Sequence, residues 1–429
     1  MGEPQRVPAR AWIVTAAGTS VNLCLGILYA WSVWKSTLLA TPAHPAGSPM
    51  TGHDDGWHYL TNLQATVAYS LCGLMFALFM IPGGRLQDRY GPRLGATLSG
   101  LFLGAGCIIA GLMKSYMGLV IGFGLLGGIG MGLGYAAATP AAVRWFGAQR
   151  RGLIVGIVVA GYGGAAIYIS PLAKYLIAQE GLTGSFVTLG VLFAAVIVFA
   201  AQFLKMPPPG YAPPVVAPAT PVATTTAASP RQDWAPRDVL RTWQFYALLI
   251  LMFGSAQSGI LVIANAAPIH KELAVGVTSF LANAWLLASF GGFVNASGRI
   301  GTGVYSDTVG RANAYAINGL LSVVCLFLLP TITASGNLIL LFVVVGVIYW
   351  QYGGTLALIP AWTADFFGSK NLGLNYGLVF LGWGFAFFVP LLAGVIKDEF
   401  GSLDYAFYFS GTLLLLAVGL SRLVKRPTA

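Results

Sequence analysis

The sequence predicts an all-α integral membrane protein with twelve transmembrane helices, arranged as two pseudo-symmetric six-helix bundles. Its composition, its apolar runs and an internal repeat support this fold class. Of its 429 residues, 57% are hydrophobic and 8% are charged, whereas soluble domains have about 25% charged residues. A soluble core could not hide so much apolar surface.

Long apolar runs follow one another along the whole chain. A helix needs about 20 residues to cross the hydrocarbon layer. The first run follows Arg6 and Arg10 but is much longer than the apolar part of a signal peptide, so we expect it to stay as a helix. The runs lie at 12–39, 59–83, 94–112, 117–143, 152–176, 185–204, 242–268, 278–306, 314–334, 337–364, 375–396 and 405–422.

The basic residues are unevenly distributed between the connections. With the N-terminus in the cytoplasm, 17 of the 23 lysines and arginines fall on the cytoplasmic side. This bias is typical of membrane proteins and sets their orientation, so we expect both termini in the cytoplasm. The net charge of +10 therefore reflects topology, and no nucleic-acid partner is expected.

Two short patterns occur once in each half of the chain. The spacing Gly-x3-Asp-x2-Gly in residues 84–91 recurs in 303–310, 219 residues later, and the pattern Phe-Gly-x4-Gly-Leu-x2-Gly at Phe146 recurs at Phe367, 221 residues later. Such a repeat indicates a duplicated six-helix unit, with a binding site where the two units meet.

The segment between the sixth and seventh runs lacks hydrophobic periodicity and is rich in Pro, Ala and Thr, as in an extended tether. We therefore predict an N-terminal bundle over 1–205, a cytoplasmic linker over 206–241 and a C-terminal bundle over 242–429.

The loop sequence GGRLQDRYGPR resembles the cytoplasmic loop signature of the major facilitator superfamily. A carboxylate at the end of a helix can pair with arginines of its own loop and with a neighbouring helix end, and these pairs must break when the inward face opens. The resemblance implies gating roles for Asp88, Arg89, Arg93, Asp307 and Arg311. The alternative is that these residues only set topology.

Two further segments refine the resemblance. GILYAWSVW in the first run and RWFGAQRRGLIVGIVVAGYGGA at the start of the fifth resemble the monocarboxylate transporters and the related oxalate/formate antiporters. This resemblance implies a secondary transporter. In that family an arginine of the eighth helix holds the substrate carboxylate, and Arg299 occupies the corresponding place.

The depth of Arg299 agrees with that role. Eight helical residues separate it from Asp307, which puts it about 12 Å below the cytoplasmic surface. A guanidinium there costs at least about 2.5–3.5 kcal/mol, so it should face a wet cavity or an anion. An arginine that ends its helix or reaches back to the surface is the structural alternative.

Asn295 lies one turn before Arg299, where animal monocarboxylate transporters look to have an aspartate that carries the proton. An amide cannot titrate, so this departure puts the simplest coupling scheme in doubt. Asn295 can instead orient Arg299, bind a substrate hydroxyl or only pack.

The cations suggest the charge of the substrate. In the oxalate/formate antiporters that this sequence resembles, the site has two cations, and the second is a lysine of the eleventh helix. The eleventh run here has no lysine. Lys370 precedes that run, and Lys35 lies near the outer end of the first helix. One buried cation balances one carboxylate, so lactate or pyruvate is favoured over oxalate.

Aromatic and titratable residues complete the candidate site. The helices that occupy central positions in the family carry Tyr29, Tyr135, Tyr349, Tyr352 and Phe380, which we expect to line the cavity; packing is the alternative for each. Near the outer start of the second helix, His53, Asp54 and His58 could relay protons, although a solvated loop also explains them.

We therefore predict a proton-coupled symporter of small monocarboxylates. We expect it in the plasma membrane, which in a bacterium is the inner membrane. An organic-anion exchanger is the first alternative, and a non-transporting carboxylate sensor is less favoured. We expect no enzyme activity, cofactor or metal, and the four cysteines fit packing. The sequence leaves the oligomeric state open, with a monomer as the simplest form.

Overall fold

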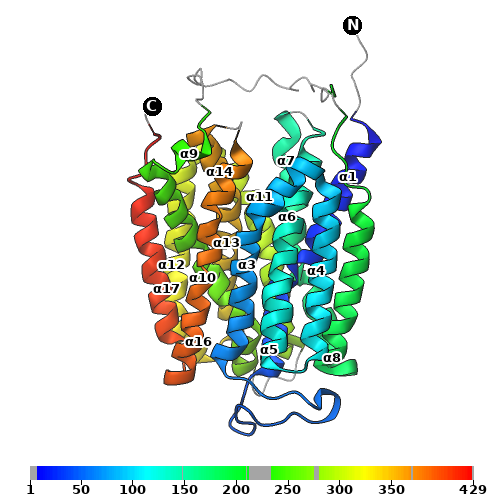
Figure 1. Cartoon of the computed structure of the whole chain (residues 1–429). Helices are drawn as coiled ribbons and strands as arrows, with labels where there is room; N and C mark the ends of the chain where they lie inside the picture. The colour runs from blue at the N-terminus through cyan, green and yellow to red at the C-terminus, as the bar shows by residue number, and fades with distance from the viewer. Residues whose placement is uncertain are drawn as a thin grey trace.

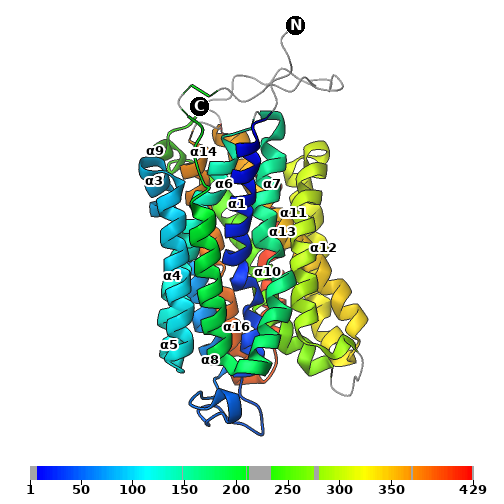
Figure 2. The same cartoon turned by 90° about the vertical axis from the view of Figure 1, so that its right-hand side faces the viewer.

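The computed structural model describes residues 7–146, 148–208, 210–211, 233–274, 280–368 and 371–427, with only the backbone for 148–152. These residues form a bundle of long helices (Figure 1). α1 begins and α17 ends at one end of the bundle, which we call the terminal face. The opposite end carries the loop of residues 39–61 and is called the loop face (Figures 1 and 2).

The first half of the chain forms six passes through the bundle. Gly181 has a φ of 70° inside α8, which divides this element into the end of the fifth pass and the whole of the sixth. The elements of this half are α1 (Ala9–Leu25), η1 (Gly26–Ala30), α2 (Trp31–Leu38), α3 (Asn62–Tyr90), α4 (Pro92–Leu112), α5 (Tyr116–Gly118), η3 (Leu119–Gly127), α6 (Gly128–Val143), α7 (Ala148–Gly164) and α8 (Ala166–Ala201).

The second half also forms six passes. A short helix, α9 (Pro236–Val239), precedes them, and the eleventh pass is divided into three pieces, α14 to α16. The passes are α10 (Trp243–Leu273), α11 (Trp285–Val309), α12 (Arg311–Ser335), α13 (Leu338–Phe367), α14 (Leu372–Val379) with α15 (Leu381–Phe385) and α16 (Phe388–Phe400), and α17 (Asp404–Ser421).

Length and apolar composition identify ten candidate membrane spans in the described residues. One of them, Leu153–Ala201, contains the break at Gly181 and therefore crosses twice. α11 is long enough at 25 residues but is absent from the ten, and it contains Arg299. When the second crossing of Leu153–Ala201 and the crossing of α11 are added to the ten spans, the total is the twelve passes that the sequence predicts. The all-helical fold class is confirmed.

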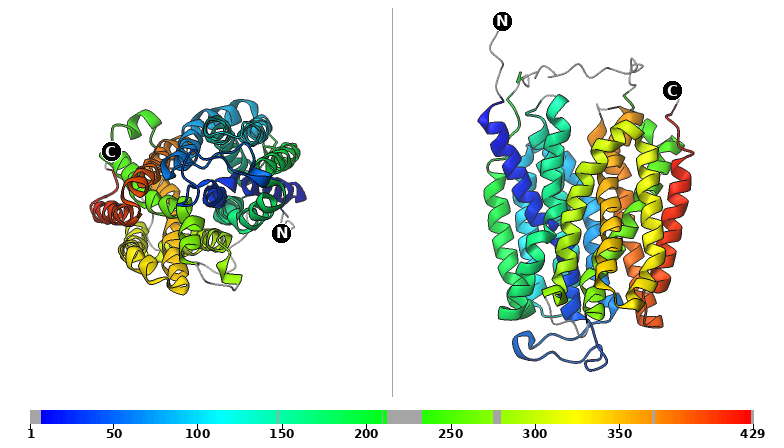
Figure 3. Two further views of the ribbon diagram at one scale, coloured as in Figure 1. Left: turned by 90° about the horizontal axis from the view of Figure 1, so that it is seen from below. Right: turned by 180° about the vertical axis from the view of Figure 1, so that it is seen from behind.

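The two halves lie side by side, as the view along the bundle shows (Figure 3). The matched glycines of the repeat also share one conformation. Gly91 has φ 84° and ψ 169° between α3 and α4, and Gly310 has φ 88° and ψ 151° between α11 and α12. Only glycine adopts this region readily, so the repeated pattern encodes the same turn in each half.

Close helix contacts explain part of the high glycine content. A Cβ added at Gly106 in α4 would lie 2.5 Å from the carbonyl oxygen of Gly122 in η3. Small residues let backbones approach in a membrane, where burial of apolar surface does not drive helix association. The four cysteines are buried and form no disulfide, in agreement with packing.

Most of the predicted linker lies outside the described residues. Its described end contains Trp234, whose N–H donates to the carbonyl oxygen of Phe367 at 3.0 Å and whose carbonyl accepts from the Asn371 side chain at 2.9 Å. The division at 205 and 241 stays a prediction.

Candidate functional site

Arg299 lies within α11, which is helical without a break from Trp285 to Val309. The helix therefore preserves the eight-residue separation from Asp307 on which the predicted depth depends. Only 5% of Arg299 is exposed. A guanidinium in the interior of a membrane protein needs hydrogen-bond acceptors, because unsatisfied charge is costly there.

Neutral groups supply those acceptors. Nε donates to Asn295 Oδ1 at 3.2 Å, Nη1 to the carbonyl oxygen of Val159 at 3.1 Å, and Nη2 to the hydroxyl of Tyr29 at 3.4 Å. No aspartate or glutamate in the described part of the chain forms an ion pair with Arg299. Within the described ranges, the positive charge is therefore buried without a negative counterpart.

A chain of hydrogen bonds continues from Tyr29. Its hydroxyl lies 2.7 Å from that of Tyr352, which accepts from the indole N–H of Trp383 at 2.8 Å. These residues come from η1, α13 and α15, so the chain joins the two halves. η1 packs directly against α7 and the start of α8 because Gly26 has no side chain. A Cβ at Gly26 would lie 2.6 Å from the Tyr162 carbonyl oxygen.

Aromatic rings surround this polar chain. The ring of Tyr162 lies 4.9 Å from that of Tyr29 and 5.5 Å from that of Tyr135, while Tyr135 lies 6.3 Å from Phe380. Phe76 contacts both Tyr135 and Phe380. The result is a mostly apolar enclosure with a few hydroxyls and one indole N–H, next to one guanidinium.

The structure thus brings together most of the predicted substrate residues. Arg299, Asn295, Tyr29 and Tyr352 are joined by hydrogen bonds, and Tyr135 and Phe380 by ring contacts. Tyr349 is buried about two turns away, where its ring faces Gly291 of α11 and its hydroxyl has no partner among the described residues. Among the described residues, it therefore forms no hydrogen bond with the Arg299 cluster.

Sequence analysis missed several members of this cluster, namely Phe76, Val159, Tyr162, Gly163 and Trp383. Three of them lie in the segment IVVAGYGGA, whose resemblance to the family did not indicate which residues face the site. Each of them also contacts a residue more than 100 positions away in the chain, and no local pattern encodes such pairs.

The burial of Lys35 contradicts the prediction of a single buried cation. Lys35 does lie near the end of the first pass, but it is only 1% exposed, and its ammonium donates to Thr66 Oγ1 at 3.0 Å and to Asn265 Oδ1 at 2.7 Å. The interior therefore holds a second cation besides Arg299, and the premise of a single buried cation is wrong. Lys370 lies outside the described residues.

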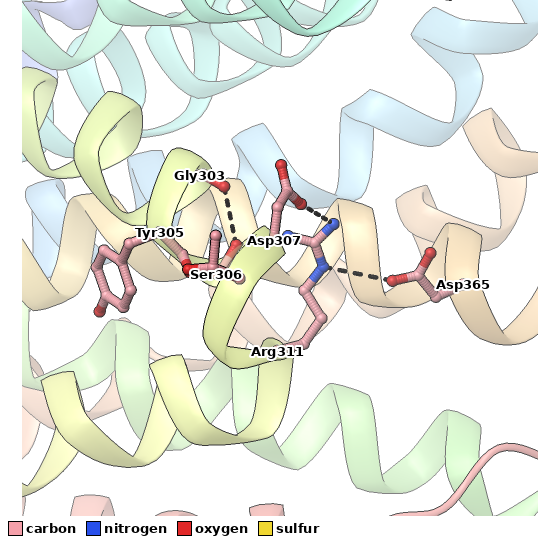
Figure 4. A network of polar contacts seen from close by, with 7 residues as sticks. Gly303, Tyr305, Ser306, Asp307, Arg311 and Asp365 are labelled. Atoms are coloured by element: carbon pink, nitrogen blue, oxygen red, sulfur yellow. Dashed lines mark hydrogen bonds and ion pairs between the residues drawn. The ribbon is translucent and has the colours of Figure 1, made fainter. Parts of the chain in front are cut away.

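The second copy of the loop motif forms a network at the terminal face (Figure 4). Arg311 pairs with Asp307 at 2.6 Å and with Asp365 of α13 at 3.3 Å, and it also donates to Ser306. These residues all belong to the second half. Asp307 thus pairs with the arginine of its own loop, as the motif predicts.

The first copy of the motif is more exposed. Asp88 pairs with Arg144 at the end of α6 at 3.3 Å, and Arg89 lies over the ring of Tyr90. The charges of Arg10 and Arg93 lower the pKa of Lys205, so Arg93 belongs to a basic group at the terminal face. The gating roles of these residues stay predictions.

The proposed proton-relay residues lie in the loop of residues 39–61. Asp54 accepts a hydrogen bond from the Leu182 backbone N–H at 2.6 Å, where the helix restarts after Gly181. His53 and His58 are exposed, and His58 lines a cavity of about 360 Å³ between this loop and the starts of α3 and α5. None of the three contacts Arg299.

Comparison with known proteins identifies the family. The family model described as Major Facilitator Superfamily matches residues 23–353. The chain belongs to this superfamily. An uncharacterized MFS-type transporter of Escherichia coli is 27% identical over 381 residues, which is 89% of this chain and 87% of that protein.

Two relatives within the superfamily have more specific names. The oxalate:formate antiporter of Oxalobacter formigenes is 28% identical and covers 72% of this chain and 70% of its own length. Monocarboxylate transporter 12 of Xenopus laevis is 25% identical, with coverage of 80% and 77%. The chain is therefore a multi-pass membrane transporter, and its relatives include both groups that the sequence resembles.

Proposed function

We propose that this transporter carries a small monocarboxylate, of the lactate or pyruvate type, with Arg299 binding the carboxylate between two rocking halves. The observation that carries the proposal is the buried guanidinium with neutral acceptors alone. A planar guanidinium matches a carboxylate through two parallel hydrogen bonds. A substrate anion would supply the negative charge that the surrounding residues lack.

The enclosure around Arg299 supports a small substrate. Phe76, Tyr135, Tyr162 and Phe380 pack ring against ring beside Arg299, so a substrate bound there would have to be small and carry at most a short apolar group. The hydroxyls of Tyr29 and Tyr352 can bond a carbonyl or hydroxyl oxygen next to the carboxylate. Lactate and pyruvate carry both features, and relatives named monocarboxylate transporters are consistent with them.

Proton coupling is the finer part of the proposal. Among the described residues, the hydrogen-bonded cluster of Arg299 contains no carboxylate and no histidine, and Asn295 cannot titrate. Symport would then use groups outside the cluster, and His53, Asp54 and His58 remain candidates.

Exchange of organic anions is the second candidate, because it needs no proton carrier. The burial of Lys35 also favours it, since a second cation in the interior suits a second negative charge. The antiporter relative agrees with this alternative. Under either mechanism we expect the terminal face in the cytoplasm and the protein in the plasma membrane, working as a monomer.

The first test is uptake of labelled L-lactate by proteoliposomes that contain the purified transporter alone. Accumulation driven by an inward proton gradient, with no acid inside, would support symport of a monocarboxylate. Uptake only when oxalate, formate or lactate is trapped inside would support the exchanger. Saturable binding with no uptake under either condition would overturn both and favour a sensor.

Arg299→Lys tests the binding role. A lysine keeps the charge but cannot form the two parallel bonds, and a hydrogen bond to a charged group is worth about 1.5–3 kcal/mol. We expect kcat/KM for uptake to fall at least about tenfold, at normal expression. The exposed Arg237, changed to Lys, is the matched control. Unaltered uptake by Arg299→Lys would refute carboxylate binding at this residue.

A further inference from the structure

The Arg299 side chain is seated against a helix of the other half. Its Nη1 donates to the carbonyl oxygen of Val159 in α7, and Gly163 follows Val159 by one helical turn. An ideal Cβ at Gly163 would lie 2.9 Å from Nε of Arg299, 3.2 Å from Cζ and 3.4 Å from Nη2. The guanidinium thus occupies the space where a side chain at position 163 would begin.

The geometry of an α-helix explains why a glycine is needed at this position. Residues four apart lie on the same face, so a side chain at 163 would stand beside the Val159 carbonyl. Without it, the guanidinium reaches that carbonyl directly. Gly163 has no left-handed φ, so its backbone conformation does not itself demand glycine.

The neighbouring glycines, Gly161 and Gly164, face residues other than Arg299. Gly161 faces α1, where a Cβ would lie 2.9 Å from the Thr19 carbonyl oxygen. Gly164 has room: a Cβ there would lie 3.4 Å from Ile167 Cδ1 and 3.8 Å from Ala296 Cβ, which are ordinary contacts. Of the three glycines, Gly163 is therefore the one that contacts Arg299.

We propose that Gly163 is a positioning residue for Arg299, setting the angle at which the guanidinium meets the substrate carboxylate. This inference rests on the proposed function. Arg299 belongs to the second half and Gly163 to the first, so the contact also aligns the halves across the site. The atoms that a new methyl group would meet are the end of a flexible side chain, so α7 can stay in place while the guanidinium turns.

Gly163→Ala is the test, with Gly164→Ala as the matched control one residue away. The added methyl should push the guanidinium off the Val159 carbonyl and away from Tyr29. We expect KM for L-lactate to rise about tenfold, the effect of roughly one hydrogen bond, with Vmax within about threefold of the unmodified protein. Gly164→Ala should leave both constants and the melting temperature unchanged.

A purely structural role for Gly163 would give another pattern. A lower melting temperature and lower Vmax at constant KM, or identical behaviour of the two variants, would overturn the proposal.

A second measurement needs no substrate. Phenylglyoxal modifies arginine side chains, and the rate at Arg299 can be followed by peptide mass spectrometry. We expect a faster reaction in Gly163→Ala than in Gly164→Ala, because the displaced guanidinium has lost its backbone partner. Equal rates would refute the positioning contact. A faster rate with no carboxylate transport by the unmodified protein would instead refute the proposed function and leave the contact intact.

Discussion

The two ends of the bundle are held together in different ways. At the loop face, hydrogen bonds join the two halves to each other. At the terminal face, the ion pairs that the described residues form each join two groups of the same half, Asp88 with Arg144 and Arg311 with Asp307 and Asp365. In the part of the chain that the structure describes, the polar bridge between the halves therefore lies at the loop face.

The bridge at the loop face follows one side of α3. The Asp398 carboxylate of α16 accepts from the backbone N–H groups of Asn62 and Leu63 at 2.9 and 2.8 Å. One turn later, Thr66 accepts from Lys35, whose ammonium also donates to Asn265 of α10. Lys271 adds a contact to the Ser36 carbonyl oxygen at 3.4 Å. These groups would have to separate for the loop face to open.

This difference indicates which parts of the molecule the motif loops hold together in the present conformation. Asp307 and Asp365 both hold Arg311, so they brace the second half as a unit (Figure 4). A brace inside one half does not itself hold the halves together, whereas a bridge between halves does. In alternating access, the bridged end is the closed one.

The largest effect on the bridge is expected from Asn265→Leu. It removes the acceptor that Lys35 finds in the other half and leaves an ammonium buried with only Thr66. We expect the free energy of unfolding to fall by about 1.5–3 kcal/mol, the contribution of a hydrogen bond to a charged group. The melting temperature in detergent measures this change.

Lys35→Met combined with Asn265→Leu is the control. Replacing both partners with apolar groups of similar shape is often close to neutral, so the double variant should recover most of the lost stability. A double variant less stable than Asn265→Leu alone would show that the pair is not the source of the effect.

Asp398→Ala should have the next largest effect. Loss of a carboxylate that caps a helix N-terminus costs about 0.5–2 kcal/mol. Because Asp398 and the helix that it caps belong to different halves, this loss should destabilise the conformation that is closed at the loop face relative to the open one. Spin labels at Met117 and Leu281, on different halves, would report the loop face by electron–electron distance measurement. We expect the long-distance population to grow by about two- to thirtyfold relative to the short one.

The adjacent Glu399→Ala is the matched control, because Glu399 is exposed and makes no ion pair with the described residues. An equal distance distribution in Asp398→Ala and Glu399→Ala would remove Asp398 from the bridge.

Sequence reasoning succeeded where local rules apply. The twelve passes follow from apolar run lengths, the helical separation of Arg299 from Asp307 from the continuity of the eighth pass, and the paired turns at Gly91 and Gly310 from the repeat. It failed where two distant segments meet. Lys35 and Asp398 stand at the ends of apolar runs, where a charge is expected to reach water, and only the packing of α2 and α16 against the other elements shows what they contact.

The smallest effects should come from the terminal face, and they distinguish its two motif loops. Asp88 and Arg144 have exposed side chains, 68% and 54%, and such pairs contribute about 0–1 kcal/mol. Arg311 is only 22% exposed and serves two carboxylates. Asp307→Asn should therefore lower the melting temperature more than Asp88→Asn, and added salt should reduce the Asp88→Asn effect further because exposed charges are screened.

Neither variant should change the label distances at the loop face, because each breaks a contact inside one half. If Asp88→Asn or Asp307→Asn shifted that distribution as much as Asp398→Ala does, the two ends would be coupled through these loops. The motif would then act on the closure between the halves even while its ion pairs lie within one half, and the distinction between brace and bridge would fail.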